Sequence, residues 1–234
     1  GAFAKPTIIN NVETLACLPF IIENGAAAFK AMGTPTSAGP KLMGISGHVN
    51  KPGCYEEELG IPMGKLVEKY ALGVRGKYKS AFHGGISMGV LGTDQWDAPL
   101  DFDIGKKYGV LGLGTACVTI MNDTVDMVKV ARNCVRFYAH ESCGQCTPCR
   151  EGSSWMAKML NRIVDGRGRA KDLDMLLELG LSQGTMPGTT ICGLADGTNW
   201  VIKTILQKFP DDFKRAIKNE SVQGVTLTVA GVGV

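Results

Sequence analysis

Apolar residues recur at helical spacing in two separate parts of the chain. Within residues 13–32 they follow a helical period that Pro19 interrupts, which predicts one kinked helix or two short ones. After residue 122 the same period returns in four stretches, at residues 125–138, 155–163, 173–177 and 202–209. The second half of the chain is therefore predicted to form four helices, the first of them capped by Asp123.

The stretch between these helical parts contains short apolar runs separated by turn residues. Small and proline-rich residues at 33–40 end the first helical pattern and mark a boundary. Beyond them the pattern predicts a helix at 63–70 and strands at 41–45, 48–49, 53–56, 80–82, 110–111 and 116–121. We expect an α+β fold divided into residues 1–40, 41–122 and 123–220. Residues 221–234, of which 222–234 alternate like a strand, stay unassigned.

Composition narrows the class of protein. A chain of 234 residues that is 44% hydrophobic can bury a sizeable core. The formal charge of +3 is too small to suggest a nucleic-acid partner. The longest mostly apolar run, residues 109–121, is short and rich in glycine, so we expect no membrane insertion. The number of cysteines and the lack of a secretory leader favour a cytoplasmic or mitochondrial-matrix location.

Three cysteines at three-residue steps carry the most informative chemistry. Cys143, Cys146 and Cys149 share one short loop, and Cys192 is the natural fourth thiol. Neighbouring thiols of this kind pair poorly with one another, whereas an iron–sulfur cube requires several converging thiolates. Structural zinc is the first alternative, although a second Cys-x2-Cys pair is missing, and disulfides are the other.

Other residues have plainer interpretations. Cys54 and Cys117 are predicted to be packed thiols, and Cys134 and Trp155 to be core residues. His140 is expected at the surface or behind the ligands, because four thiolates already suffice. The glycines at 84–85 and 112–114 are interpreted as turns and not as nucleotide-binding loops.

Four stretches resemble one known family. Residues 141–152, with the sequence ESCGQCTPCREG, resemble the cluster-binding signature of the NADH- and FMN-binding subunit of respiratory complex I. Residues 5–15, 44–55 and 190–196 resemble the same family, in the family's order. The resemblance implies a soluble-ligand-binding β-grasp domain followed by a four-helix bundle that carries a 4Fe-4S cluster. In this interpretation Arg150 lies close enough to the anionic cluster to raise its potential.

The resemblance also implies that most of the NADH- and FMN-binding domain lies outside this chain. The chain looks like a fragment that keeps only the tail of the NADH- and FMN-binding domain, where Asn10, Asn11 and Thr14 match positions that approach FMN. A turn at Asn10–Asn11 followed by a helix from Val12 is the structural alternative for these residues.

The function expected on this basis is electron transfer from NADH via FMN to the cluster and on towards quinone. The partners would be other subunits of a membrane-bound NADH dehydrogenase, including a neighbouring iron–sulfur subunit. A diaphorase subunit of an NAD-linked hydrogenase or formate dehydrogenase is the competing enzyme. A non-enzymatic metal-stabilised scaffold is the remaining alternative.

Overall fold

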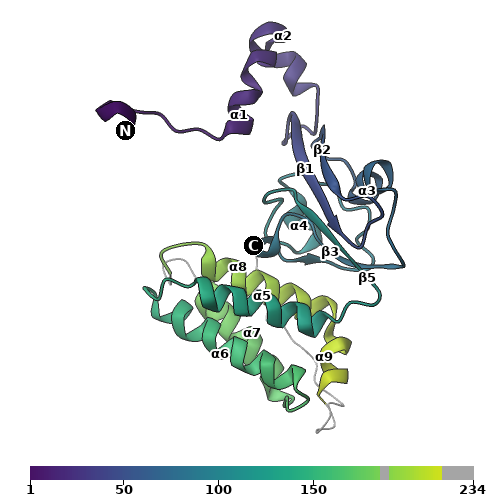
Figure 1. Cartoon of the computed structure of the whole chain (residues 1–234), viewed down its shortest axis with the longest axis vertical. Coiled ribbons are helices and arrows are strands. Elements are labelled where there is room, and N and C mark those ends of the chain that lie inside the picture. The colour runs from purple at the N-terminus through teal and green to yellow at the C-terminus, as the bar shows by residue number, and fades with distance from the viewer. Residues whose placement is uncertain (185–189, 218–234) are drawn as a thin grey trace.

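The computed structural model describes residues 1–184 and 190–217, which form a projecting arm, a mixed sheet and a group of packed helices (Figure 1). The strand predicted at 222–234 lies outside the described residues, as does all of the unassigned stretch 221–234. In the part that the structure describes, no helix combines the length and the apolar character needed to cross a bilayer.

The N-terminal arm carries two short α-helices, as predicted. They are α1 (Val12–Ala16) and α2 (Leu18–Lys30), preceded by the 3-10 turn η1 (Ala2–Ala4). Pro19 lies in the first turn of α2, where a missing N–H costs no helical hydrogen bond. The arm extends away from the rest of the molecule (Figure 1). Its apolar side chains Ile8, Ile9 and Ile22 are at least 80% exposed.

The sheet has the strand order β2-β1-β5-β3-β4. Its strands are β1 (Pro40–Gly47), β2 (Gly53–Glu58), β3 (Tyr78–Phe82), β4 (Val90–Leu91) and β5 (Val118–Asn122). β1 runs antiparallel to β2 and parallel to β5, which also pairs antiparallel with β3. The connections contain α3 (Met63–Ala71), η2 (Ile86–Met88) and α4 (Ile104–Tyr108).

Two of the predicted strands are absent at their predicted places. Residues 48–49 follow the end of β1, and Val49 forms only an isolated bridge with Val74. Residues 110–111 follow α4 as a bend, and the Leu111 amide donates a hydrogen bond to the Met88 carbonyl at 3.0 Å. The short elements β4, η2 and α4 were missed, because two to five residues are too few to show a period.

The sheet buries its two faces unequally. One face carries Met43, Ile45, Val118 and Ile120 into a core shared with α3 and α4. On the opposite face Phe82, Val90 and Met121 join the core of the helical part, as far as β3, β4 and β5 reach. The helical part does not cover the same face of β1 and β2. Leu42 is 52% exposed there and lines a groove between this face and the N-terminal arm.

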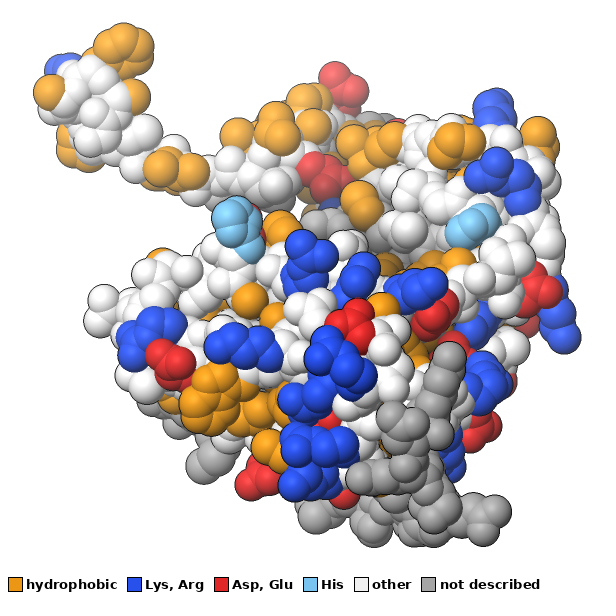
Figure 2. Space-filling model, turned by 60° about the horizontal axis from the view of Figure 1, so that its bottom comes forward, with side chains coloured by type: hydrophobic (Ala, Val, Ile, Leu, Met, Phe, Trp, Pro, Cys, Tyr) orange, Lys and Arg blue, Asp and Glu red, His pale blue; other side chains and the backbone are white. Residues whose placement is uncertain are grey.

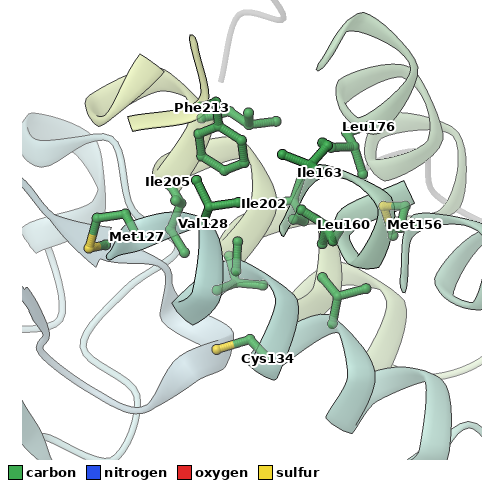
Figure 3. Close-up of a cluster of buried hydrophobic side chains, with 14 of the residues drawn as sticks. Met127, Val128, Cys134, Met156, Leu160, Ile163, Leu176, Ile202, Ile205 and Phe213 are labelled. Atoms are coloured by element: carbon green, nitrogen blue, oxygen red, sulfur yellow. The ribbon is translucent and has the colours of Figure 1, made fainter. Parts of the chain in front are cut away.

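The helical part consists of helices that pack about a common core (Figure 3). They are α5 (Met127–Glu141), α6 (Thr147–Val164), α7 (Lys171–Gly184), α8 (Leu194–Lys208) and α9 (Pro210–Ala216). The four helical stretches predicted from the sequence correspond to α5, α6, α7 and α8. The short helix α9, which places Phe213 in the core, was missed.

Two details of the helical prediction are wrong. Asp126, not Asp123, caps α5, and its Oδ1 accepts hydrogen bonds from the amides of Val128 at 2.9 Å and Lys129 at 3.2 Å. Trp155 is 51% exposed, because the buried stripe of α6 runs instead through Met156, Leu160 and Ile163. A repeat of four residues drifts around a helix of 3.6 residues per turn, so Trp155 lies outside the buried stripe.

Helix α8 joins the helices to the sheet. The Thr204 hydroxyl accepts a hydrogen bond from the Val90 amide at 3.0 Å. One turn later the Lys208 ammonium donates to the carbonyl oxygens of Val90 at 2.8 Å and Tyr108 at 2.9 Å. These bonds fix α8 against β4 and α4, and so fix the position of the loop that precedes α8.

We expect the replacement of Asp172 by alanine to lower the free energy of unfolding by about 3 kcal/mol. The Asp172 carboxylate is fully buried at the start of α7 and accepts from the Arg162 guanidinium at 2.6 Å and from Arg169 at 3.0 Å. Burial alone raises its pKa, but the hydrogen bonds from both arginines outweigh burial and lower it. Urea unfolding of Asp172→Ala and of the exposed neighbour Asp174→Ala measures the difference. Equal midpoints for the two variants would contradict the prediction.

A second prediction concerns acid. His83 is fully buried, and its Nε2 lies 2.7 Å from the Gly112 carbonyl, so Nε2 carries the proton that it donates to this oxygen. Its Nδ1 is buried without a partner, and burial lowers the pKa to about 4, against 6.5 for the ordinary side chain. The contribution of His83 to stability is therefore complete above pH 6.5. It falls by roughly 1 kcal/mol per pH unit as the pH drops from 6.5 towards 4, since the unfolded chain binds a proton that the folded chain excludes.

His83→Gln, whose amide can still donate to Gly112, should lessen this acid dependence in denaturant titrations between pH 4 and 7. His140→Gln is the matched control, since His140 is 86% exposed. An unchanged slope in His83→Gln would show that another group dominates the acid response.

Candidate metal centre

The first three candidate ligands lie in the hairpin between α5 and α6. α5 ends at Glu141, residues 143–146 form the turn, and α6 begins at Thr147. Gly144 adopts φ +79°, a left-handed conformation that favours glycine. The Arg150 guanidinium donates to the Gly144 carbonyl at 2.7 Å and so braces the turn from the first turns of α6. The local sequence thus brings the three thiols close together, with Cys143 and Cys146 in the loop and Cys149 in the first turn of α6.

The fourth candidate comes from a different loop. Cys192 lies two residues before α8, and the amide of Ile191 donates to the Cys146 sulfur at 3.3 Å. This contact joins segments that are 45 residues apart. All four candidate thiols, from Cys143, Cys146, Cys149 and Cys192, line one pocket of about 170 Å³. The structure therefore brings together the four cysteines that the sequence selected.

The pocket lies where two helices begin. Cys146 is the N-cap of α6, Cys149 occupies its first turn, and Cys192 immediately precedes the N-cap Gly193 of α8. The free amides and the dipole at a helix N-terminus favour negative charge. Both helix N-termini therefore favour an anionic group bound in this pocket.

The four thiols differ in exposure. Cys149 is buried, Cys146 is half-buried, and Cys143 and Cys192 are exposed. The Ser142 hydroxyl lies 3.4 Å from the Cys149 sulfur, at the closed side of the pocket. The site thus has a covered side that packs on the helical core and an open side that faces outward.

The donor set fits an iron–sulfur cluster. Four soft sulfur donors around one enclosed space are the ligands that a 4Fe-4S cluster takes. Among residues 1–184 and 190–217, no three His, Cys, Asp or Glu side chains converge closely enough for a single metal ion. A cluster does not require such convergence, because each of its irons binds a different thiolate.

The remaining cysteines are separate from this pocket. Cys134 is buried in α5, and burial raises the pKa of its thiol to about 12, as expected of a packed core residue. Cys17 is half-buried in the arm. Cys54 and Cys117 are exposed, so the prediction that they are packed thiols is wrong. Both lie on the open face of the sheet, which no described helix covers at that point.

Several other residues lie beside the four candidate thiols. His140 is exposed at the end of α5, which confirms the predicted surface placement. Arg150 contacts the loop carbonyl of Gly144 and pairs with Glu151 at 3.0 Å, so part of its charge is compensated. The pocket is also lined by Glu141, Ser142, Thr190, Leu194 and Ala195. These residues lie in the two stretches that resemble the family, 141–152 and 190–196, although the sequence analysis gave none of them a role.

The three residues matched to FMN contacts lie on the arm. Asn11 caps α1, and its Oδ1 accepts from the amides of Glu13 at 2.9 Å and Thr14 at 3.2 Å. The helix from Val12 that the structural alternative predicted is therefore present, but Asn11 is extended and residues 10–11 form no turn. Asn10 and Thr14 are exposed beside it, far along the chain from the thiol pocket.

Comparison with known proteins now identifies the class of the helical part. Residues 129–216, which contain the pocket, match the family described as the NADH-ubiquinone oxidoreductase-F iron-sulfur binding region. That part of the chain is similar to this iron–sulfur family, and the resemblance noted in the sequence is confirmed.

Whole-chain relatives extend the match. The chain is 41% identical over 222 residues to the F subunit of NADH-quinone oxidoreductase from Rickettsia typhi, covering 94% of this chain and 52% of that protein. It is 44% identical over 215 residues to the F 2 subunit of NADH-quinone oxidoreductase from Rhizobium meliloti, covering 91% of this chain and 50% of that protein. The chain thus spans about half the length of the curated relatives it matches.

A solved structure shares the fold. A chain of an NAD⁺-reducing [NiFe]-hydrogenase in the air-oxidised state superimposes with a TM-score of 0.81 at 31% identity, covering 94% of this chain and 37% of that chain. The mixed α+β architecture with a five-stranded sheet is thereby confirmed as one found in a known redox enzyme.

We expect serine at position 143, 146, 149 or 192 to abolish or disrupt cluster binding, because each replacement removes one of four thiolates. The anaerobically prepared parent chain should hold about four irons with sulfide. Cys134→Ser is the control and should keep the iron, at a packing cost of about 1 kcal/mol. Iron and sulfide analysis decides the outcome. Full iron in Cys192→Ser together with loss in Cys134→Ser would contradict the ligand set.

Proposed function

We propose that the chain is the electron-transfer part of an NADH dehydrogenase, with Cys143, Cys146, Cys149 and Cys192 as ligands of a 4Fe-4S cluster. The observation that carries this proposal is the four-thiol pocket at the N-termini of α6 and α8, inside the region that matches the iron–sulfur family. When bound, such a cluster exchanges single electrons, which suits a carrier between a flavin and the next redox centre.

The residues around the pocket would favour the reduced, more negative state. The Ile191 amide points at the Cys146 sulfur, and hydrogen bonds to cluster sulfurs raise the reduction potential. The N-termini of α6 and α8 act in the same direction. The partial exposure of Cys143 and Cys192 leaves one side of the site open for electron exchange with a partner.

NADH and FMN would be bound by a part of the protein that precedes the described sheet. We assign residues 1–40 to that part, with Asn10, Asn11 and Thr14 at its FMN edge. The support is the arm itself, whose hydrophobic side chains lie exposed along its length (Figure 2). Phe3, Ile8 and Ile9 are each at least 88% exposed, as expected of residues that another part of the protein covers.

The finer architecture is part of the same proposal. The strand order β2-β1-β5-β3-β4, with β1 and β5 parallel, supports a β-grasp for residues 41–122. The mutual packing of α5, α6, α7 and α8 supports a four-helix bundle for residues 123–220. The remaining partners would be other subunits of a membrane-bound complex, among them a neighbouring iron–sulfur subunit that accepts the electrons.

A second candidate function has a specific observation in its favour. The structural relative at TM-score 0.81 is part of an NAD⁺-reducing hydrogenase, so the same electron-transfer unit could serve a hydrogenase or formate dehydrogenase diaphorase. The relatives named as NADH-quinone oxidoreductase subunits, at 41 and 44% identity, favour the NADH dehydrogenase. Identification of the subunits that copurify with the native protein distinguishes the two.

We expect dithionite, but not NADH with added FMN, to reduce the cluster-loaded chain under anaerobic conditions. Hydride transfer requires the nicotinamide to be stacked on the flavin, and this chain supplies at most one edge of that site. Visible absorption and a paramagnetic resonance signal report the reduction, and Cys192→Ser is the control without a cluster. Rapid bleaching by NADH alone would overturn the assignment of the nucleotide site to another part of the protein.

A further inference from the structure

The open face of the sheet carries two thiols that the proposed function does not use. Cys54 lies on β2 and pairs in register with Gly44 on β1. On the other side of β1, Ile45 pairs with Val118 of β5, which places Cys117 directly beside Gly44. Both cysteines are exposed, and directly paired residues project from the same face of a sheet. The two thiols therefore flank Gly44 on one surface.

The glycine keeps the space between the thiols free. A Cβ added to Gly44 would lie 3.2 Å from the Cys117 sulfur, which shows that this sulfur leans over Gly44 and not away from it. Any larger residue at position 44 would occupy the gap between the two thiols. Leu42 on one side and the hydrogen-bonded pair of Ser46 and Thr119, 3.0 Å apart, on the other complete the surface.

The spacing excludes a direct disulfide. Cys54 and Cys117 are separated by two strand intervals, so their Cα atoms are about 9.6 Å apart. A disulfide requires Cα atoms less than about 7 Å apart. A two-coordinate metal ion needs a longer sulfur–sulfur separation of about 4.6 Å, twice a metal–thiolate bond. The Cys117 sulfur already leans over Gly44, and rotation of the Cys54 side chain about χ1 brings the two sulfurs towards this separation without movement of the strands.

We propose that Cys54 and Cys117 form a two-thiolate site for a soft monovalent cation such as Cu(I), with Gly44 as the residue that keeps it open. Soft thiolate donors select such ions over the harder divalent ones. Binding one Cu⁺ releases the two thiol protons and forms two copper–sulfur bonds, with no change in the oxidation state of the metal. The site lies on the sheet and is independent of the four-thiol pocket between the helices.

The test uses the cluster-loaded chain and Cu(I) supplied from a buffered chelator complex without oxygen. The parent chain should take up one Cu⁺ that Cys54→Ser and Cys117→Ser each lose, with retention against the chelator weakened roughly 100-fold or more. Cys17→Ser, which removes a thiol on the arm, should retain it. Equal copper uptake by the parent and both serine variants would overturn the proposal, as would release of iron in step with copper uptake.

Gly44→Val tests whether copper binding needs the gap at position 44 or only the two cysteines. It keeps both cysteines, which a monofunctional thiol reagent should still count, but its side chain fills the gap and should abolish the copper site. If circular dichroism shows that valine disturbs the sheet, Gly44→Ala provides the smaller change. It should weaken copper binding less than valine does. Undiminished copper binding in both variants would refute the role of Gly44. If mass spectrometry detected a disulfide between Cys54 and Cys117 after mild oxidation, the two cysteines would be closer together than the proposed site requires.

Discussion

The packing of α8 is the interaction on which the rest of the structure depends. Its buried residues Val201, Ile202 and Ile205 lie in the core of the helical part, while Thr204 and Lys208 bond to β4 and α4. α7 approaches α8 so closely that a Cβ at Gly184 would collide with the Ala195 carbonyl. One helix therefore fixes the sheet, α7 and the loop that carries Cys192 at the same time.

The candidate metal centre follows from this packing. The local sequence of the α5–α6 hairpin brings three thiols together, but these are only three of the four candidate cluster ligands. The fourth arrives because α8 begins beside that loop, where the Ile191 amide reaches the Cys146 sulfur. The same arrangement directs two helix N-termini at the pocket, so the geometry that completes the candidate ligand set also favours an anionic group there.

Unequal covering of the sheet divides one face into two kinds of surface. Where Phe82, Val90 and Met121 meet the helices, this face is core. Where it extends onto β1 and β2 it is open, and alternation within a strand then exposes Cys54 rather than burying it. Cys54 and Cys117 were predicted to be packed because free cysteines are usually buried. That rule uses residue type alone, and the sequence does not show whether helices pack against this part of the sheet.

The sequence by itself determined the helices α5 to α8, the positions of strands β1, β2, β3 and β5, and the choice of four cysteines. Helical period and three-residue thiol spacing are local, and local order suffices to specify them. Tertiary structure decided which face of each element is buried, as Trp155 and Cys117 show, since burial depends on what packs against an element. It also decided that Cys192 meets Cys146. A contact across 45 residues forms only when the helices between them fold back, and that depends on the core they share.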